Sequence, residues 1–307
     1  MSEQHKKNEK NFLIQGSILA IAGVITKLIG AFYRIPLLNI IGTEGNGYYS
    51  VAFSIYSVAL MLTSYSLPLA VSKLVSARVA VGEYKNANKI FRGAMTFALL
   101  AGGIVSLLVF FGADFIATTI MHLDMSAYAL RVLGPCILIV ALLGVLRGFF
   151  QGMGSMIPTA ISQVIEQIVN AVISIAGAYL LFNAGRAVGK TRGDKSFGPA
   201  YAAAGGNTRN SPWCIERLDI CRIHFSRIPQ SIQKENETRS FEGKRESYRT
   251  VYKVLFVTIA PVILSATVYN ISDFVDTALF NNVMAAQGFS KKNTQVFLES
   301  FRDSTVQ

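Results

Sequence analysis

The sequence has little charge, few cysteines and a single tryptophan. Charged residues make up 15% of its 307 residues, against about 25% in an average soluble domain. Three cysteines without paired spacing exclude a small disulfide-bonded scaffold. The sequence also lacks a Walker loop, a nucleophile elbow and an HExxH motif. The low charge excludes a soluble multidomain protein, which would need more polar surface. Because the catalytic and metal-binding motifs are missing, we expect no enzyme and no metal site.

What the sequence has instead is apolar length combined with basic charge. Hydrophobic residues make up 51% and the net charge is +11, with a mean hydropathy of +0.41. In a polytopic membrane protein such charge is typical of cytoplasmic loops, so we expect no nucleic-acid partner. The N-terminal MSEQHKKNEKN is too polar for a cleavable signal peptide. The first apolar segment is therefore expected to stay in the bilayer as an anchor.

Apolar stretches long enough to cross a bilayer recur along the chain. A membrane-spanning helix needs about 20 mostly apolar residues. We expect seven segments, at about residues 12–35, 48–71, 93–116, 127–150, 158–182, 197–206 and 251–280, the sixth stopping after about ten residues. The predicted fold class is all-α.

Lys and Arg in short loops predict the orientation. They gather at the N-terminus, in the loop between the second and third segments and at Arg147, whereas the loops at 38–46 and 117–126 carry none. Cytoplasmic loops carry the excess of basic residues, so we expect a multi-pass protein with a cytoplasmic N-terminus. An expected loop at 183–196 breaks this pattern, with Arg186, Lys190, Arg192 and Lys195 on the opposite side.

Residues 207–249 differ from their surroundings. They hold nine basic and six acidic residues, together with Trp213, Cys214 and Cys221. One reading is a polar inserted loop, and the other is a shift of reading frame. Codons for the segment from Trp213 to Gln230 can be chosen to read GALSGLIFVAFIFLVYRK one nucleotide along, which would complete the sixth helix and end in basic residues. The tail from Asn293 behaves likewise, and sequencing the DNA would decide between the readings.

These observations divide the chain into five parts. They are a cytoplasmic tail (1–11), five spans and the start of a sixth (12–206), a discordant polar segment (207–247), the region of the seventh span (248–292) and a discordant C-terminal tail (293–307).

Four stretches carry a resemblance to a known family. They are GAFYRIPLLNIIGTEGNGYYSVAFSIY (30–56), SLPLAVSKLVSARVAVGEYKNANKIFR (66–92), LRGFFQGMGSMIPTAISQVIEQ (146–167) and APVILSATVYNISDFVDTALF (260–280). In this order they resemble the polysaccharide-biosynthesis and stage V sporulation protein B-like branch of the multidrug/oligosaccharidyl-lipid/polysaccharide exporter superfamily. That branch is similar to the lipid II flippases of peptidoglycan synthesis.

The resemblance implies a fold of two six-helix lobes around a central cavity that opens alternately to each side of the bacterial cytoplasmic membrane. This chain would contain the N-terminal lobe and the first helix of the second lobe, and we expect this truncated form to be defective in transport. The implied function is flipping of a polyprenyl-diphosphate-linked oligosaccharide or cell-wall precursor by a monomer. No cofactor is implied, apart from a coupling Na⁺ or proton.

Two cations in the first segment are candidates for binding such a substrate. Arg34, in FYRIP, presents a planar donor fork that suits a diphosphate, and the flippases that this chain resembles use cavity arginines in this way. A snorkelling interfacial arginine is the alternative. Lys27 lies deeper, where a charge is costly and favours a wet cavity or an ionic partner.

Polar residues in the fifth and seventh segments complete the candidate site. Glu166 is a candidate partner for Lys27 or a proton carrier, and Gln163 lies beside it at helical spacing; the alternative is polar helix packing. Asp273 and Asp276 share a helix face with Asn270 and are candidates for binding the coupling ion. If that helix ends early, the two carboxylates are only solvated cap residues.

Two other functions stay open from the residues alone. Cation-coupled multidrug efflux is known in the same superfamily and would favour an acidic, aromatic-lined cavity. A membrane glycan polymerase or ligase would need large outer loops with carboxylates or histidines. The short expected outer loops make this enzyme the last of the three.

Overall fold

The computed structural model describes residues 2–207 and 247–287, and this part of the chain contains helices and no strands. The helices, including the two π-helical turns η1 and η2, are α1 (Ser2–Leu60), η1 (Met61–Tyr65), α2 (Ser66–Ala80), α3 (Tyr84–Phe111), α4 (Ala113–Phe115), η2 (Ile116–Ile120), α5 (Ser126–Gly152), α6 (Ile157–Arg192), α7 (Phe197–Gly206) and α9 (Tyr248–Ala286). The all-α prediction is confirmed. The predicted discordant segment and the tail from residue 293 lie outside the described residues, except at the edges of the segment.

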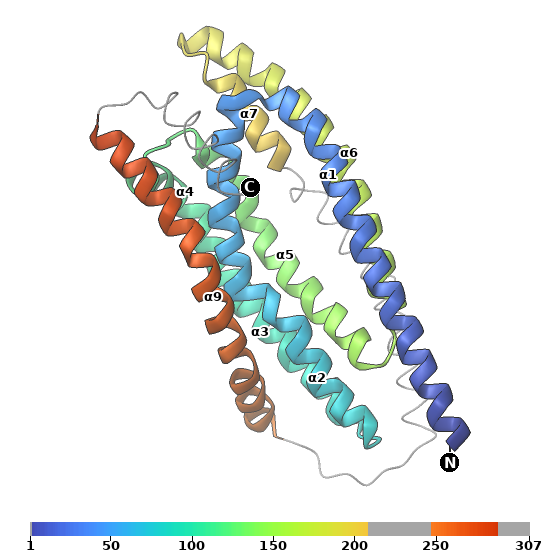
Figure 1. The fold of residues 1–307 in the computed structure, drawn as a ribbon. Coiled ribbons are helices and arrows are strands. Elements are labelled where there is room, and N and C mark those ends of the chain that lie inside the picture. Colours follow the sequence, from blue (N-terminus) through green and yellow to red (C-terminus); the bar gives the residue numbers. More distant parts are fainter. Residues whose placement is uncertain (1, 208–246, 288–307) are drawn as a thin grey trace.

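The helix α1 contains two spans joined by a kink. Gly42 has φ 71° and ψ 175°, a backbone conformation that breaks the helix and that residues with a Cβ rarely adopt. Figure 1 shows the chain reversing at this end of α1. The first limb (residues 2–41) runs beside α6, and the second limb (43–60) continues through η1 into α2. The predicted spans at 12–35 and 48–71 are therefore separate crossings.

By length and composition, five helical stretches of the described chain are able to cross a membrane. They are Leu13–Ala80, Tyr84–Phe111, Ser126–Gly152, Ile157–Arg192 and Tyr248–Ser265. The first is 68 residues long, about 100 Å if straight, so the kink at Gly42 makes it two crossings. The helix α7 has 10 residues and spans only about 15 Å, as its interrupted apolar run predicts.

The helix α5 lies at the centre of the packing. Its glycines at positions 144, 148 and 152 form a stripe with a spacing of four residues that faces α2. A Cβ on Gly148 would lie 2.5 Å from the carbonyl oxygen of Pro68, and one on Gly152 would lie 2.7 Å from Cβ of Val75. The backbones of α5 and α2 therefore touch, as small residues allow in membrane helices.

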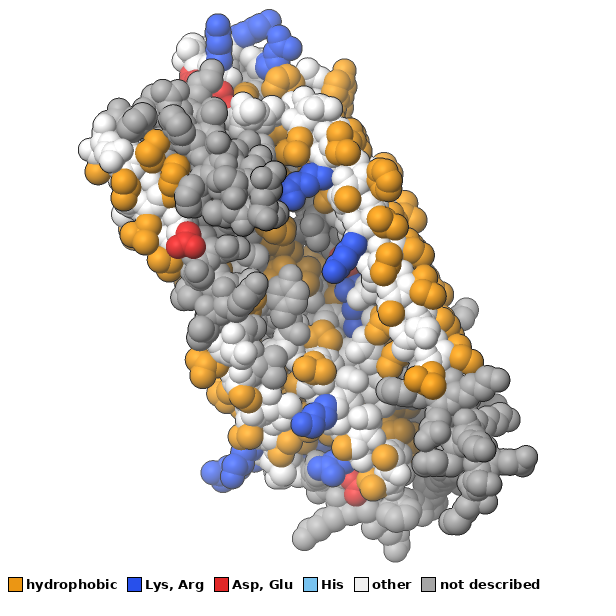
Figure 2. Space-filling view, viewed as in Figure 1, with side chains coloured by type: hydrophobic (Ala, Val, Ile, Leu, Met, Phe, Trp, Pro, Cys, Tyr) orange, Lys and Arg blue, Asp and Glu red, His pale blue; other side chains and the backbone are white. Residues whose placement is uncertain are grey.

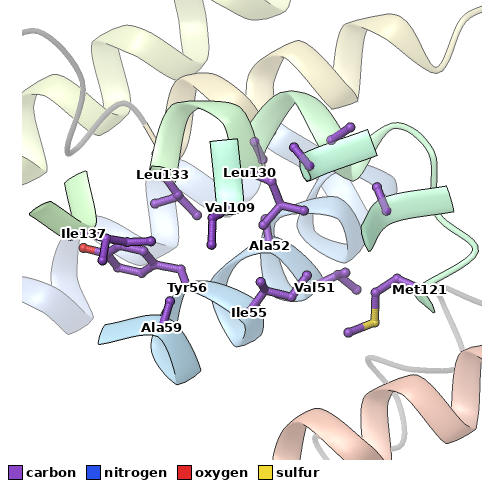
Figure 3. Packing of buried hydrophobic residues seen from close by; sticks show 14 of the residues in the cluster. Val51, Ala52, Ile55, Tyr56, Ala59, Val109, Met121, Leu130, Leu133 and Ile137 are labelled. Carbon is purple, nitrogen blue, oxygen red and sulfur yellow. The ribbon is translucent and has the colours of Figure 1, made fainter. Parts of the chain in front are cut away.

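An apolar core joins α5 to the second limb of α1 and to α3. Figure 3 shows Val51, Ile55 and Tyr56 of α1 packed with Leu130 and Ile137 of α5. All five are buried. The second limb of α1 is accordingly buried or half-buried along most of its length, and the core fixes one side of the bundle.

The helix α6 is longer than its apolar segment, and this corrects the predicted loop at 183–196. It continues to Arg192 and turns at Gly193, which has φ 73°. Gly185 lies against α7, since a Cβ there would be 2.4 Å from the carbonyl oxygen of Phe197. The basic residues Arg186, Lys190 and Arg192 therefore lie on a helical extension rather than in a loop.

The helix α9 packs along the opposite side of the bundle from the first limb of α1 (Figure 1). Near one end, the rings of Phe97 and Phe256 meet edge to face with centroids 6.4 Å apart. Near the other end, the Nε2 atom of His122 and the Oδ1 atom of Asn282 are 2.8 Å apart in a hydrogen bond. His122 has φ 52°, a strained conformation for a residue with a Cβ.

The helix ends group as the loop charges predict. The N-terminus, the α2–α3 turn and the α5–α6 turn lie at one end of the bundle in Figure 1, whereas the kink of α1 and the α6–α7 turn lie at the other. Below, the first is called the N-terminal end of the bundle.

Candidate substrate-binding site

The first limb of α1 carries both predicted cations. Lys27 and Arg34 are seven residues apart, about two helical turns, so they project from the same face and are separated by about 10 Å along the axis. Both side chains are exposed in the described structure. Two cations at this separation form a ladder along the helix rather than a single point charge.

The cations do not lie on the face of α1 that is suited to lipid. Ile21, Val24, Leu28, Phe32 and Ile35 are exposed, and helical geometry gathers them on one face about a third of a turn from the cations. Figure 2 shows Lys and Arg side chains in a row along the inner edge of the α1–α6 pair, beside a hollow in the surface. This arrangement favours a wet cavity wall over lipid as the surroundings of Lys27 and Arg34.

A polar stripe on α6 runs next to the first limb of α1. A Cβ on Gly30 would lie 3.2 Å from Nε2 of Gln167, so this glycine makes room for the amide. The Nδ2 atom of Asn170 donates to Oε1 of Gln167 at 3.5 Å, and the hydroxyl of Ser174 donates to Oδ1 of Asn170 at 3.2 Å. The two hydrogen bonds lie within α6, and the contact of Gln167 with Gly30 joins α6 to α1. Gln163 is half-buried and stays a candidate.

Glu166 forms an ion pair with Arg147, whose place near the end of α5 is a signal of orientation. The Arg147 guanidinium on α5 donates through Nη2 to Oε2 of Glu166 and through Nε to the hydroxyl of Ser162, the latter at 3.3 Å. The side chains of Arg147 and Glu166 are only 20% and 19% exposed. Arg147 is thus an ionic partner of Glu166, and the pairing of Glu166 with Lys27 stays a prediction.

The sequence held a signal for this pair. Arg147 lies five residues before the end of α5, about 7 Å inside the helix, and the next helix offers a carboxylate. Charges within spans are costly unless paired. An arginine and a glutamate within consecutive spans therefore predict a partnership across a helix hairpin. Another contact at this hairpin is the Gln15 side-chain oxygen, which accepts a 2.9 Å hydrogen bond from the backbone N–H of Met156.

The predicted ion-coupling residues lie elsewhere. The helix α9 runs unbroken to Ala286, ten residues beyond Asp276, so the alternative that this carboxylate caps an early helix end is wrong. Asp276 is exposed, whereas the side chains of Asn270 and Asp273 lie outside those that the structure describes. The helix α9 and the first limb of α1 lie on opposite sides of the bundle (Figure 1), so Asp276 and Arg34 do not form one site.

The arrangement is suited to holding an anion without reacting with it. Arg34 offers a planar pair of donors and Lys27 a compact ammonium, both fixed on one helix. A ligand with phosphate groups and a polar body suits the face of α1 that carries these two cations.

Two solved structures have a fold similar to that of this chain. The structure of a MOP superfamily transporter from Pyrococcus furiosus Vc1 superposes with a TM-score of 0.62 at 16% identity, covering 97% of this chain and 60% of that one. A MATE transporter in complex with Br-NRF superposes with a TM-score of 0.61 at 16% identity, covering 97% and 64%. The chain thus shares its fold with these solved transporters.

The sequence then gives the family. Residues 13–189 match the family described as "Polysaccharide biosynthesis protein", and the chain belongs to it. In Bacillus subtilis (strain 168), the chain is 26% identical to the lipid II flippase MurJ over 90% of its own length and 50% of that protein. It is 32% identical to stage V sporulation protein B over 64% of its length and 36% of that protein. The chain therefore spans half or less of these relatives.

Proposed function

We propose that this chain is the cation-bearing N-terminal lobe of a flippase that moves a polyprenyl-diphosphate-linked oligosaccharide or cell-wall precursor across the cytoplasmic membrane. The observation that carries this proposal is the ladder of two exposed cations, Lys27 and Arg34, on one face of the first limb of α1. The similarity to a lipid II flippase and to a sporulation protein supports a lipid-linked saccharide as the cargo.

The physical task is to lower the cost of moving a charged headgroup through an apolar slab. An unpaired charge in the membrane interior costs at least about 3 kcal/mol. Cations spaced by about 10 Å on α1 offer successive partners to a diphosphate as it moves past them. The polyprenyl tail stays in lipid, which the exposed apolar face of α1 adjoins, so only the polar part has to enter the hollow.

Inward-facing and outward-facing structures of MATE family transporters with a similar fold support alternating access as the mechanism. In it, one lobe moves against the other, and the hollow opens to each side in turn. We propose that the N-terminus is cytoplasmic, because the basic α2–α3 turn lies at the N-terminal end of the bundle (Figure 1). The ion that drives the cycle is assigned to Asp273 and Asp276 of α9, with Na⁺ or a proton as the coupling species and Asn270 as a further oxygen ligand.

Binding by the purified 307-residue chain tests the proposal. Native mass spectrometry in detergent would compare a polyprenyl-diphosphate sugar with a neutral polyprenyl alcohol. We expect the diphosphate to bind and Arg34→Gln to weaken its binding about tenfold, because charge-assisted hydrogen bonds contribute about 1.5–3 kcal/mol. Lys73→Gln, an exposed cation of α2, is the matched control and should leave binding unchanged.

Two outcomes would overturn this function. Equal binding by the Arg34→Gln and Lys73→Gln variants would remove Arg34 from the substrate site. Preferential binding of a cationic drug over the diphosphate would instead favour multidrug efflux. In cells, full complementation of a flippase-deficient strain by Arg34→Ala in a full-length two-lobe protein would likewise exclude Arg34 from the mechanism.

A further inference from the structure

A second concave site lies between the N-terminal halves of α3 and α9, away from the cations of α1. It is a pocket of about 600 Å³. Its lining residues are Phe91, Arg92, Met95, Thr96, Tyr248 and Tyr252. The wall is thus mainly aromatic and aliphatic, with one guanidinium. Pockets of this make-up bind amphiphiles, because one charged group fixes a polar head while the rest of the wall accepts apolar atoms.

Positive charge surrounds this pocket. Arg92 is exposed, and the Nζ atom of Lys89, one helical turn before it, lies 4.4 Å from the centre of the Tyr248 ring. The two helix starts together carry the basic residues Lys85, Lys89, Arg92, Arg249 and Lys253. The nearby carboxylate of Glu83 is held by Arg78 at 3.8 Å and accepts a 3.0 Å hydrogen bond from Asn86. The mouth of the pocket therefore attracts anions.

The pocket lies at the level of the lipid headgroups. Its lining residues lie in the second to fourth turns of α3 and in the first two turns of α9, in the half of the bundle that contains the α2–α3 turn. Tyrosines together with Lys and Arg at a helix start are typical of the membrane–water interface. Tyr248 and Tyr252 stack along α9, with ring centroids 6.5 Å apart, and form one such pair.

The walls are held in place by close packing. A Cβ on Gly93 would lie 3.2 Å from Cγ1 of Val251 and 3.9 Å from the ring of Tyr252, so α3 and α9 approach each other closely beside the pocket. Phe91 and Val251 are buried in the core that these helices share with α2 and α5. The pocket is therefore preformed and needs little reordering to receive a ligand.

We propose that this pocket binds one anionic glycerophospholipid, with its phosphate on Arg92 and part of one acyl chain along Phe91, Met95 and Tyr252. Basic pockets between membrane helices on the cytoplasmic side suit anionic headgroups. A phosphodiester carries a single negative charge, which matches the one guanidinium in the wall. The site is separate from the proposed saccharide site, and its occupant would bridge α3 of the first lobe and α9.

Lipid titration of the full 307-residue chain in detergent, followed by native mass spectrometry, tests the assignment. We expect phosphatidylglycerol to bind more tightly than phosphatidylcholine, and Arg92→Gln to weaken phosphatidylglycerol binding about tenfold, the loss expected for one charge-assisted hydrogen bond. Arg186→Gln is the matched control, because it removes an exposed arginine at the opposite end of the bundle. It should leave the affinity unchanged.

A second variant separates the pocket from general surface charge. Thr96→Trp fills the pocket and keeps every cation, and Thr96 is exposed, so the fold should tolerate it. It should weaken phosphatidylglycerol binding as much as Arg92→Gln does. If the Arg92→Gln variant does not fold, Thr96→Trp alone tests whether the lipid binds in this pocket. Unchanged binding in both variants, equal binding of the two lipids, or displacement of phosphatidylglycerol by a lower concentration of polyprenyl phosphate would overturn the proposal.

Discussion

The helix α5 and the first limb of α1 are both long and apolar enough to cross a membrane, but they occupy opposite positions in the lobe. The most apolar 18-residue window of α5 is 61% buried within the protein, whereas that of the stretch containing the first limb of α1 is 6% buried. The helix α5 meets its neighbours through glycines, whereas the first limb of α1 meets α6 through Gly30 and carries the exposed side chains of Lys27 and Arg34. Hydropathy alone does not tell a buried central helix from a peripheral helix that carries cations.

The difference indicates that one part of the lobe, α5, provides a rigid core, whereas another part, the first limb of α1, carries the candidate binding residues. Close backbone contact, as at Gly148, leaves no room for a larger side chain and fixes the angle at which α2 and α5 cross. The first limb of α1 is peripheral, so it can carry charges that the core would not tolerate. Substitutions in α5 should therefore change stability, and substitutions of the α1 cations should change binding.

The strongest test of the rigid side is Gly148→Leu. Its Cβ would lie 2.5 Å from the carbonyl oxygen of Pro68, which is backbone and cannot move aside. We expect destabilisation of about 3 kcal/mol or more, measured as a loss of monodisperse protein and a lower thermal unfolding midpoint in detergent. Gly103→Leu, where a Cβ meets nothing within 4 Å, is the control and should lower stability by less than about 1 kcal/mol. Equal losses in both variants would contradict the close contact of α2 and α5.

The next largest effect is expected at the hairpin of α5 and α6. Arg147→Met leaves Glu166 half-buried without its guanidinium, which should cost about 3 kcal/mol. The double variant Arg147→Met with Glu166→Gln should recover much of this loss, because no buried charge is then unpaired. A thermal unfolding midpoint in the double variant no higher than in the single one would show that the ion pair does not connect the two helices.

A smaller effect is expected where α9 meets the first lobe. Asn282→Ala removes the hydrogen bond with His122 and the 3.1 Å bond that Nδ2 donates to the carbonyl oxygen of Ile120. Both are exposed, so the loss should be about 1 kcal/mol. Cysteine crosslinking between α9 and η2 would report whether the two helices also separate in the variant. The control is Ser17→Ala, which removes a hydrogen bond from the Ser17 hydroxyl to the carbonyl oxygen of Leu13 within α1.

The smallest effect on stability is expected at the α1 cations. Lys27→Gln and Arg34→Gln change exposed side chains and should alter the free energy of unfolding by less than about 0.5 kcal/mol. A loss above about 2 kcal/mol in either variant would show that the residue is part of the packing. The comparison between α5 and the first limb of α1 would then fail.

The spans were predictable because lipid imposes a length and an apolar composition on them. The kink at Gly42, the end of α7 and the existence of α9 all follow runs that are visible in the sequence. The extension of α6 was missed, because basic residues from Arg186 onward were read as a loop. A helix that leaves the membrane stays helical when its polar residues, such as Lys190, favour helix and a glycine turn comes only at Gly193.

The site was less predictable because pairing depends on how helices cross. Lys27 and Arg34 lie on one face, as their spacing dictates, but the partner of Glu166 came from a neighbouring helix. Arg147 was visible as a charge and not as a ligand, because apolar periodicity does not tell which faces of α5 and α6 meet. The glycine spacing on α5 was visible too, and it becomes informative only once its partner Pro68 is known.

The central claim is that Arg34 faces a wet, ligand-accepting hollow whereas its neighbour Ile35 faces lipid. In a background in which the chain's three cysteines are replaced, Arg34→Cys and Ile35→Cys would each be exposed to a membrane-impermeant thiol reagent in reconstituted vesicles. We predict rapid labelling at position 34 that a polyprenyl-diphosphate sugar slows, and little labelling at position 35. Equal labelling at the two positions, or no protection of position 34 by the sugar lipid, would contradict the account.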